Sequence, residues 1–437
     1  MNDARLTTGE VHELWRVLSP RERVDAFQHM DRVEADTFFL RLGVHDQAAI
    51  LQAMGEDERR PWLRLLAPDD AADVVQQLPA HARSSFLALM DETARREVTA
   101  LLAYAEDAAG GLMSPRFARL RPEMTVGEAI SYLQRQAQQK LETVYYAYVL
   151  DPEQRLRGVV SFRELITAPA RAPLADVMHT EVVSVPDTMD QEAVAGVMTQ
   201  HDLDALPVID FEGRMKGIVT IDDVVNVVQR AATEDIQKLG GMEALDTPYL
   251  QTSMVAMVRK RAGWLSALFL GEMLTASAMG YYEAEIAKAV VLALFVPLIM
   301  SSGGNSGSQA TTLVIRAMAL GEVTPADWWR IVRRELLTGV SLGLVLALVG
   351  AIRILSWQAI FHAYGTHCGR IAVTVGVSLV GVVTWGTITG SMLPFAIRRL
   401  GLDPASASAP FVATLVDVSG LLIYFNVARM VLRGSLL

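Results

Sequence analysis

Three patterns of apolar and polar residues follow one another along the chain. The first is a twelve-residue repeat, in which apolar pairs such as Phe38-Phe39 alternate with breakers such as APDD (67–70). Its single apolar positions are Leu18, Met30, Leu42, Met54, Leu66, Leu78, Met90 and Leu102. Short helices of this spacing cannot bury their apolar faces alone and must stack on one another. The repeat predicts an all-α superhelical domain over residues 1–115, a scaffold for interaction or sensing.

The second pattern is a longer repeat. GVVSFRELI (158–166) and GIVTIDDVV (217–225) lie 59 residues apart, and each follows a strand-like run that ends in an acidic turn. An amphipathic helical pattern precedes each copy. Residues 116–230 are therefore predicted to form a pair of α/β units, each with two strands, a turn between them and a following helix.

The third pattern begins at Arg259. Five apolar runs, each longer than the ~20 residues that a membrane helix needs, predict an all-α transmembrane domain over residues 259–437. The runs are 262–282, 286–318, 331–357, 371–397 and 409–433. Basic clusters such as Arg398-Arg399 gather at one side, and the N-terminus has no apolar core of signal-peptide type. We therefore expect a cytosolic N-terminus and an outer C-terminus.

Composition narrows the partners. The chain is 51% apolar and carries a net charge of −10, with the acidity in its first 250 residues and a mildly basic remainder. Acidity of this kind argues against nucleic acid and favours cations, although ordinary solvated acidic surface has the same composition. The single cysteine, Cys368, excludes an intrachain disulfide, and together with His362 and His367 it lacks the paired spacing of a zinc site.

Two carboxylates fall inside the apolar runs. Asp417 stands near the middle of the last run, with no lysine or arginine within two helical turns in sequence. Such a group is costly in a membrane and predicts contact with hydrated cations. The alternative is a protonated Asp417 that is hydrogen-bonded to another helix. Glu272 lines the same path, pairs with Arg316 or Arg353, or lies near a boundary, and we favour a structural role for it.

A polar stretch interrupts the second run. PLIMSSGGNSGSQATT (297–312) contains a proline, adjacent glycines and two amides, and irregular polar backbone survives in a membrane only where it is buried or lines a watery cavity. Gly303, Gly304 and Asn305, if they face Asp417, would offer carbonyl and amide oxygens, which suit Mg²⁺ or Ca²⁺. Mg²⁺ keeps several waters when bound. A two-fold homodimer would place two Asp417 carboxylates around one axis and match its charge.

The chain resembles the MgtE family of magnesium channels over essentially its whole length. In the membrane domain the resemblance rests on Pro297, Gly303, Gly304, Asn305, Gly307 and Gln309, and on Pro410, Ala413, Thr414, Asp417 and Gly420. ATEDIQKLGGME (232–243) resembles the family's connecting helix, which implies a long connecting (plug) helix over residues 231–258. YAEDAAGGLMSP (104–115) resembles the family's entry into the first α/β unit. The two α/β units resemble a tandem cystathionine-beta-synthase (CBS) pair.

The CBS resemblance rests on a Gly, strand, Ser/Thr-x-x-acidic signature, present as Gly158, Ser161, Glu164 and as Gly217, Thr220, Asp223. It implies an adenosine nucleotide such as ATP near Thr220 and Asp223. The same two residue types also suit the cap of a helix N-terminus.

The MgtE resemblance implies a homodimeric Mg²⁺ channel of the cell inner membrane that serves magnesium homeostasis. The implied pore site comprises Asp417, Ala413, Gly303, Gly304, Asn305 and Thr414. Cytosolic Mg²⁺ would close the pore by bridging Asp69, Asp73, Asp190, Glu192, Asp202, Asp223, Glu234 and Asp235. The chain departs from the family at Ala409, where asparagine is common, and at Asn226 and Ala231, which replace acidic positions and predict fewer regulatory ions.

Two rival functions stay open at this point. One is a carrier that couples divalent cations to Na⁺ or H⁺, with Glu272 as the coupling carboxylate. The other is a membrane-anchored nucleotide or ion sensor without transport. An enzyme is disfavoured, because the chain shows no nucleophile-base pair, metal-ligand motif or phosphate loop.

Overall fold

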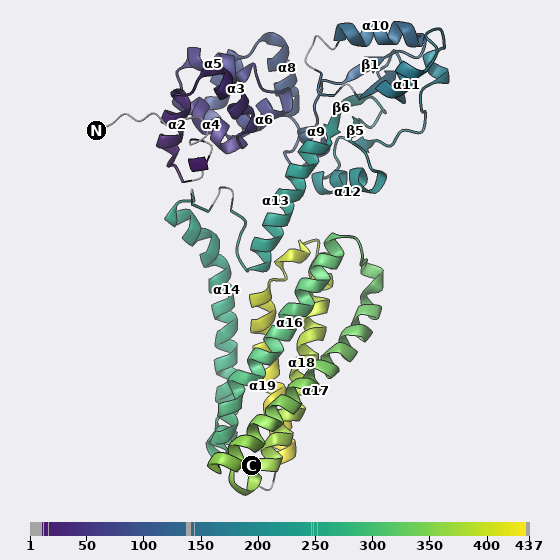
Figure 1. The fold of residues 1–437 in the computed structure, drawn as a ribbon. Coiled ribbons are helices and arrows are strands. Elements are labelled where there is room, and N and C mark those ends of the chain that lie inside the picture. The colour runs from purple at the N-terminus through teal and green to yellow at the C-terminus, as the bar shows by residue number, and fades with distance from the viewer. Residues whose placement is uncertain are drawn as a thin grey trace, which may run out of the picture. The chain divides into compact units, whose positions relative to one another are not determined.

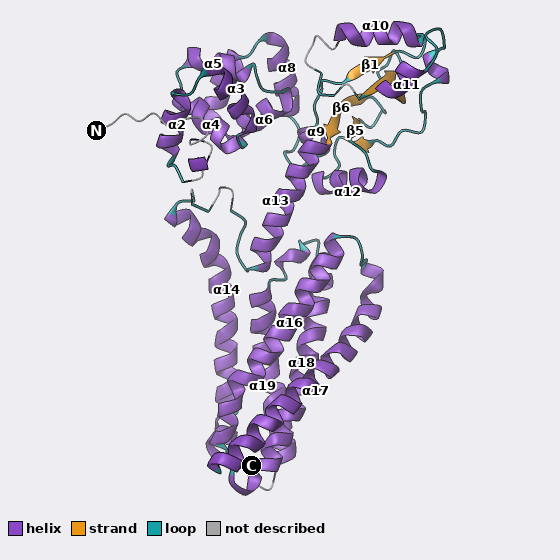
Figure 2. Cartoon of the chain, viewed as in Figure 1, coloured by secondary structure: helices purple, strands orange, loops and turns teal. Residues whose placement is uncertain are grey.

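The computed structural model describes residues 11–433 except 12, 16, 137–140, 144, 246, 248 and 251. The chain forms two compact units, Met1–Ala231 and Ala232–Leu437. Figure 1 shows the order of the elements, and Figure 2 their type. Each unit is described by itself.

Short stacked helices open the first unit, as the twelve-residue repeat predicts. They are α2 (Pro20–Gln28), α3 (Arg32–Arg41), α4 (Val44–Ala53), α5 (Glu56–Leu63), α6 (Pro68–Gln77), α7 (Ala80–Leu89) and α8 (Glu92–Leu101). Ser19, Asp31 and Asp91 cap helix N-termini with their side-chain oxygens, which satisfies backbone donors that the short helices leave free. α4 packs on α2 and α6, and α6 packs on α8. The all-α superhelical prediction is confirmed.

Two three-stranded sheets follow, one for each copy of the longer repeat. The first contains β1 (Ala118–Leu120), β2 (Tyr146–Leu150) and β3 (Leu156–Ser161), and the second contains β4 (Val185–Pro186), β5 (Ala205–Ile209) and β6 (Met215–Thr220). In each sheet the first pair of strands is parallel and the second pair is antiparallel. The strands, orange in Figure 2, confirm the predicted α/β pair.

Helices accompany both sheets. They are α9 (Ala109–Leu112), α10 (Val126–Gln136), α11 (Phe162–Thr167), the 3-10 turn η1 (Leu174–Asp176), α12 (Gln191–His201) and α13 (Ile221–Leu239). Ser114 exchanges two backbone hydrogen bonds with Ile218 of β6, at 2.8 and 2.9 Å. The second CBS copy also shares one buried apolar cluster with the helical domain, because Val194 and Leu206 join Leu51 and Val75 there. The helical domain and the CBS pair therefore form one unit.

All the secondary-structure elements in the described part of the second unit are helices. Its elements are the last part of α13, α14 (Met254–Tyr281), α15 (Glu283–Lys288), η2 (Val290–Phe295), α16 (Val296–Ala319), η3 (Pro325–Asp327), α17 (Trp328–Phe361), η4 (Gly365–His367), α18 (Cys368–Arg399), η5 (Pro404–Ser406) and α19 (Ala409–Leu432). The predicted connecting helix does not continue to residue 258, because α13 ends at Leu239 and Gly241 takes a left-handed conformation with φ of 71°.

Within the residues that the structure describes, four stretches are long and apolar enough to cross a membrane by length and composition. They are Val290–Ala319, Pro325–Phe361, Gly365–Arg399 and Ala409–Leu432. α14, the first of the five predicted spans, is not among them, so a count of five stays a prediction. Its sequence carries Glu272 among apolar residues, which lowers its mean hydropathy.

The predicted interruption at 297–312 is wrong, because α16 runs unbroken from Val296 to Ala319. Pro297 occupies the first turn, where proline needs no hydrogen-bond partner. The glycines serve close packing instead: the backbones of Gly303 and Gly307 lie against Gly386 and Gly390 of α18, so closely that a Cβ atom would clash. Thr311 adds a hydroxyl that donates to the Gly390 carbonyl at 2.8 Å.

Candidate functional site

Asp417 lies midway along α19, on a helix whose start is well defined. Ser408 caps α19 by accepting a hydrogen bond from the Phe411 amide at 3.3 Å, and Pro410 follows in the first turn. Asp417 is half-buried, and its side chain makes no ion pair or hydrogen bond within the described part of the chain. A carboxylate held in a span without a protein partner is available to an external cation.

α16 approaches Asp417 through Gly304. A Cβ atom placed on Gly304 would lie 3.3 Å from the Ala413 Cβ and 4.0 Å from Asp417 Oδ1. The missing side chain therefore leaves the Asp417 carboxylate open toward α16. The structure thus brings together three of the predicted pore residues: Gly304, Ala413 and Asp417.

The other predicted pore residues point elsewhere. Gly303 packs against Val382 and Val416 inside the helix bundle. Asn305 is exposed, and its amide donates to Ser301 Oγ at 3.3 Å. Thr414 lies against Gly271 of α14. Because α16 is a regular helix, carbonyls at 303–305 are engaged along its axis, and the expected free backbone oxygens are not formed there.

Glu272 of α14 is exposed and is the charged residue that interacts electrostatically with Asp417. Among the described residues it has no ion pair with Arg316 or Arg353. The Arg353 guanidinium instead lies 3.3 Å from the centroid of the Trp357 ring. Of the alternatives for Glu272, an ion pair with either arginine is therefore not observed among the described residues, while a structural role, a place along the Asp417 path and a position near a boundary stay predictions.

A second group of acids lies in the first unit, where α6 meets the CBS pair. Asp69 is only 8% exposed, and its Oδ1 atom has no hydrogen-bond partner. Burial raises its pKa well above the usual value, and the charges of Glu142, Asp223 and Asp70 raise it further. We call Asp69, Asp70, Asp73, Glu142 and Asp223 the acidic cluster.

Two members of the acidic cluster, Asp73 and Asp223, have pKa values raised above the usual aspartate range. Burial raises the pKa of Asp73 to about 6, although Arg230 opposes the shift. Burial also raises the pKa of Asp223 to about 7, while a 2.7 Å hydrogen bond from Thr220 Oγ1 opposes it. A nearby cation stabilises the ionised form of such neighbouring carboxyl groups, because it offsets the repulsion between their like charges.

Three other predicted regulatory residues, Asp190, Glu192 and Asp202, lie on or beside α12 and do not join this cluster. Asp190 caps the N-terminus of α12 by accepting from the Glu192 amide at 2.9 Å. Asp202 ends the same helix in a left-handed conformation with φ of 53°. All three side chains are exposed, as expected for a capped surface helix.

The last two predicted regulatory residues lie on the end of α13, in the second unit. Lys238 bonds to Glu234 at 2.5 Å and to Asp403 at 2.6 Å. Burial and the charge of Asp403 raise the pKa of Asp235. Leu239 packs beside Ile315, so the end of α13 is fixed against the membrane helices. Asp403, like Glu142 and Asp70, was not predicted, since only the fold brings it to these partners.

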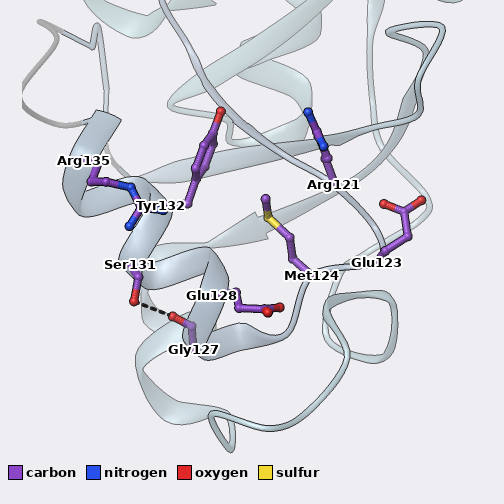
Figure 3. Close-up of a pocket in the computed structure, with 8 residues that line it drawn as sticks. All are labelled: Arg121, Glu123, Met124, Gly127, Glu128, Ser131, Tyr132 and Arg135. Carbon is purple, nitrogen blue, oxygen red and sulfur yellow. Dashed lines mark hydrogen bonds between the residues drawn. The ribbon is translucent and has the colours of Figure 1, made fainter.

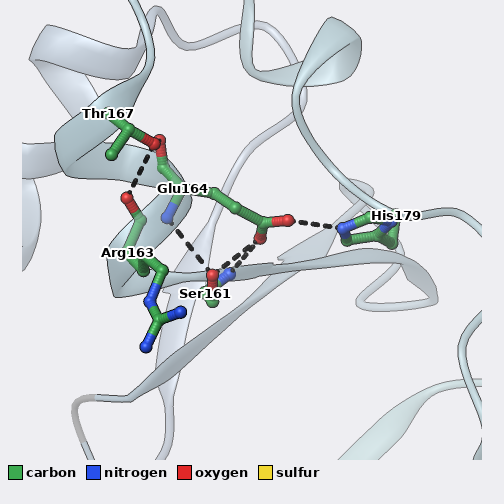
Figure 4. Close-up of polar contacts among 5 residues, drawn as sticks. All are labelled: Ser161, Arg163, Glu164, Thr167 and His179. Atoms are coloured by element: carbon green, nitrogen blue, oxygen red, sulfur yellow. Dashed lines mark hydrogen bonds and ion pairs between the residues drawn. The ribbon is translucent and has the colours of Figure 1, made fainter.

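The two CBS signatures have different surroundings. Ser161 and Glu164 form a reciprocal capping box at α11, with hydrogen bonds of 2.8 and 3.2 Å, and Glu164 also contacts His179 at 2.5 Å (Figure 4). In the second copy Thr220 is buried and bonds to Asp223. The capping role is therefore observed in the first copy.

A cavity of about 620 Å³ opens on the first CBS copy, beside α10 (Figure 3). It is lined by Arg121, Glu123, Met124, Gly127, Glu128, Ser131, Tyr132 and Arg135. The residues predicted for a nucleotide, Thr220 and Asp223, are not among them. Across the described residues no three acidic, histidine or cysteine side chains already converge as a metal site, so a bound ion would keep waters or draw the ligands together.

Sequence comparison covers the same three regions. Residues 296–427 match the MgtE family, described as a divalent cation transporter; residues 6–107 match the MgtE intracellular N domain, and residues 109–171 and 174–230 match the CBS domain. The cytosolic domain of the Mg²⁺ channel MgtE in complex with ATP aligns with a TM-score of 0.47 and 38% identity, over 51% of this chain and 90% of that chain.

Full-length relatives extend the match. The magnesium transporter MgtE of Thermus thermophilus is 40% identical over 424 residues, which cover 96% of this chain and 92% of that protein. The magnesium transporter MgtE of Enterococcus faecalis is 33% identical over 449 residues, which cover 94% and 96%. Because these alignments span nearly the whole length of both proteins, the chain belongs to the MgtE family.

Proposed function

We propose that this chain is a Mg²⁺ channel of the inner membrane, in which the ion passes Asp417. The full-length relatives are magnesium transporters by name. The observation that carries the proposal is the position of Asp417: it is half-buried in an apolar helix, free of a protein partner among the described residues, and open toward Gly304. A channel site that attracts the ion without stripping its waters needs a carboxylate of this kind.

The transported ion is bound as a hydrated ion. Mg²⁺ releases its waters reluctantly, so contacts through water suit it better than a tight cage of protein oxygens. Asp417 supplies the charge and the Ala413 carbonyl an oxygen one turn earlier. Gly303, Gly304, Asn305 and Thr414 complete the proposed pore lining, and a Cβ atom on Gly304 would lie 4.0 Å from Asp417 Oδ1.

Two copies assemble around the pore. α14 has no buried residue, and its apolar side chains Phe269 and Leu270 are 67% and 64% exposed. Its apolar surface therefore needs lipid or a second copy to cover it. At 28 residues it is also long enough to serve as a fifth span. Five spans place the N-terminus in the cytosol and the C-terminus outside.

Cytosolic Mg²⁺ closes the pore. The ion neutralises the acidic cluster, which joins α6 to the CBS pair, and without the ion the like charges repel and loosen that contact. Asp190, Glu192, Asp202, Glu234 and Asp235 are proposed as additional ligands. The end of α13 then carries the change to the membrane helices, because Lys238 and Leu239 hold it there.

ATP at the CBS pair, near Thr220 and Asp223, is proposed as a second regulator. The side chains of these residues bond to each other, so a ribose would have to compete for the Asp223 carboxylate. Titration of ATP into wild type and Thr220→Ala, followed by calorimetry, tests this part. Equal affinities would place the nucleotide elsewhere.

Mg²⁺ uptake into liposomes that contain the purified chain tests transport itself. A channel predicts uptake that follows the Mg²⁺ gradient and the membrane voltage, with no change when Na⁺ or pH gradients are collapsed. A reversal potential that shifts with Na⁺ or pH would favour the coupled carrier instead, with Glu272 as the coupling group. No uptake at any cytosolic Mg²⁺ concentration would favour the sensor.

A further inference from the structure

A cavity of about 660 Å³ lies in the second unit where α17 begins and α18 ends. It is lined by Pro325, Trp328, Met392, Phe395, Ala396, Arg398, Arg399 and Leu400. None of these residues belongs to the proposed pore or to the acidic cluster. Because both helices are candidate membrane spans, the cavity lies at the end of two spans, where lipid headgroups are found.

The inner side of the cavity is apolar. Phe395 is buried and belongs to one cluster with Val314 and Met318. Trp328 and Leu400, at its edge, are 44% and 76% exposed. Tryptophan is enriched at membrane-water interfaces, where its ring meets acyl chains and its N–H meets headgroups. An apolar surface of this kind is suited to a lipid and does not suit a small hydrated anion.

The rim of the cavity is cationic. Arg398 and Arg399 lie in the last turn of α18, are exposed, and make no ion pair with any residue that the structure describes. The helix is ended firmly beside them, since Gly401 takes a φ of 74° and the Leu402 amide bonds to the Ile397 carbonyl at 3.2 Å. Two guanidinium groups on a fixed backbone can bind a phosphate with several parallel hydrogen bonds.

We propose that this cavity binds an anionic phospholipid, with its phosphate at Arg398 and Arg399 and its acyl chains along Trp328, Phe395 and Leu400. Basic pockets between membrane helices bind such headgroups. Arginines at a helix C-terminus also stabilise the helix dipole and orient a membrane protein. Neither of those roles accounts for the apolar cavity under the two side chains.

Binding of dibrominated phosphatidylglycerol to the full-length protein in detergent tests the proposal, with quenching of tryptophan fluorescence as the signal. Quenching by this lipid should exceed quenching by dibrominated phosphatidylcholine. It should fall in Trp328→Phe but not in Trp329→Phe, since Trp329 does not line the cavity. Each cationic side chain near a membrane surface raises the affinity for anionic lipid about fivefold. The double variant Arg398→Gln/Arg399→Gln should therefore bind the lipid with a roughly thirtyfold weaker affinity.

The double variant Arg330→Gln/Arg333→Gln is the matched control, because it removes the same charge from exposed positions of α17 outside the cavity. It should keep the wild-type affinity. Equal losses in both double variants, or no loss in either, would overturn the proposal in favour of diffuse surface charge. Competition by inorganic phosphate alone would overturn the lipid as ligand. These readouts do not depend on Mg²⁺ transport, so their failure and a failure of the channel proposal are distinguishable.

Discussion

Asp223→Asn should stabilise the first unit at neutral pH. Asparagine has nearly the shape of aspartate, and its Oδ1 atom can still accept the hydrogen bond from Thr220, which is 2.7 Å long in the wild type. The substitution therefore removes a charge from the acidic cluster without removing a contact. Its effect on stability measures how strongly the cluster resists being ionised.

The magnitude follows from the pKa of Asp223, which is raised to about 7 in the folded chain and is about 3.9 in an unfolded one. Because the folded state binds this proton more tightly, its contribution to stability is complete below about pH 4 and is lost as pH rises through about 7. The loss is at most about 4 kcal/mol, and roughly half of that where solvent screens the partly exposed group. Asp223→Asn does not lose this stability as pH rises, because asparagine does not ionise.

Urea unfolding of a fragment spanning residues 1–239, followed by circular dichroism in EDTA, provides the assay. At pH 8 the variant should unfold at a urea concentration higher by about 1 M, for a slope of about 2 kcal/mol per molar. At pH 4 the two midpoints should nearly coincide. Millimolar Mg²⁺ should raise the wild-type midpoint at pH 8 more than the variant midpoint. Equal midpoints at pH 8 without Mg²⁺ would refute the reasoning.

Three further predictions concern helix packing, a helix cap and a pair of ion pairs. Gly386→Val should place a side chain where the Gly303 backbone lies and lower the thermal midpoint of the detergent-solubilised protein, at a cost of about 1–3 kcal/mol; an unchanged midpoint would contradict it. Ser161→Ala should destabilise the 1–239 fragment by about 1 kcal/mol in urea, through loss of the α11 cap, and a larger loss on Thr167→Ala would argue against the cap. Lys238→Gln should speed hydrogen exchange in the last turn of α13, because it removes two ion pairs. Unchanged exchange would show that these ion pairs do not stabilise that turn.

The fold was predictable because its signals are periodic. The twelve-residue repeat and the two copies at 158–166 and 217–225 each mark elements that recur in the structure at the same spacing. The interruption predicted at 297–312 is wrong for a physical reason: glycine, serine and asparagine weaken a helix in water, yet between membrane helices small residues allow close packing. Gly303 and Gly307 are helical for that reason.

The site was predictable only in part. Asp417 stands out in the sequence because a carboxylate in an apolar run is rare, but that Gly304 rather than Asn305 lies beside it depends on the face of α16 that meets α19. Glu142 and Asp403 carry no local signal, since each is a single acidic residue outside any repeat or motif in the sequence. They become part of a site only when α6, the CBS pair and α13 are folded.

Mg²⁺ flux into liposomes containing Asp417→Asn tests the central claim most directly. The neutral amide keeps the size of the side chain but loses the charge that attracts the ion, so flux should fall roughly tenfold or more. Glu285→Gln, which removes a carboxylate that pairs with Arg429 at 3.6 Å instead of facing Gly304, is the control and should keep wild-type flux. Wild-type flux through Asp417→Asn would contradict the proposed pore.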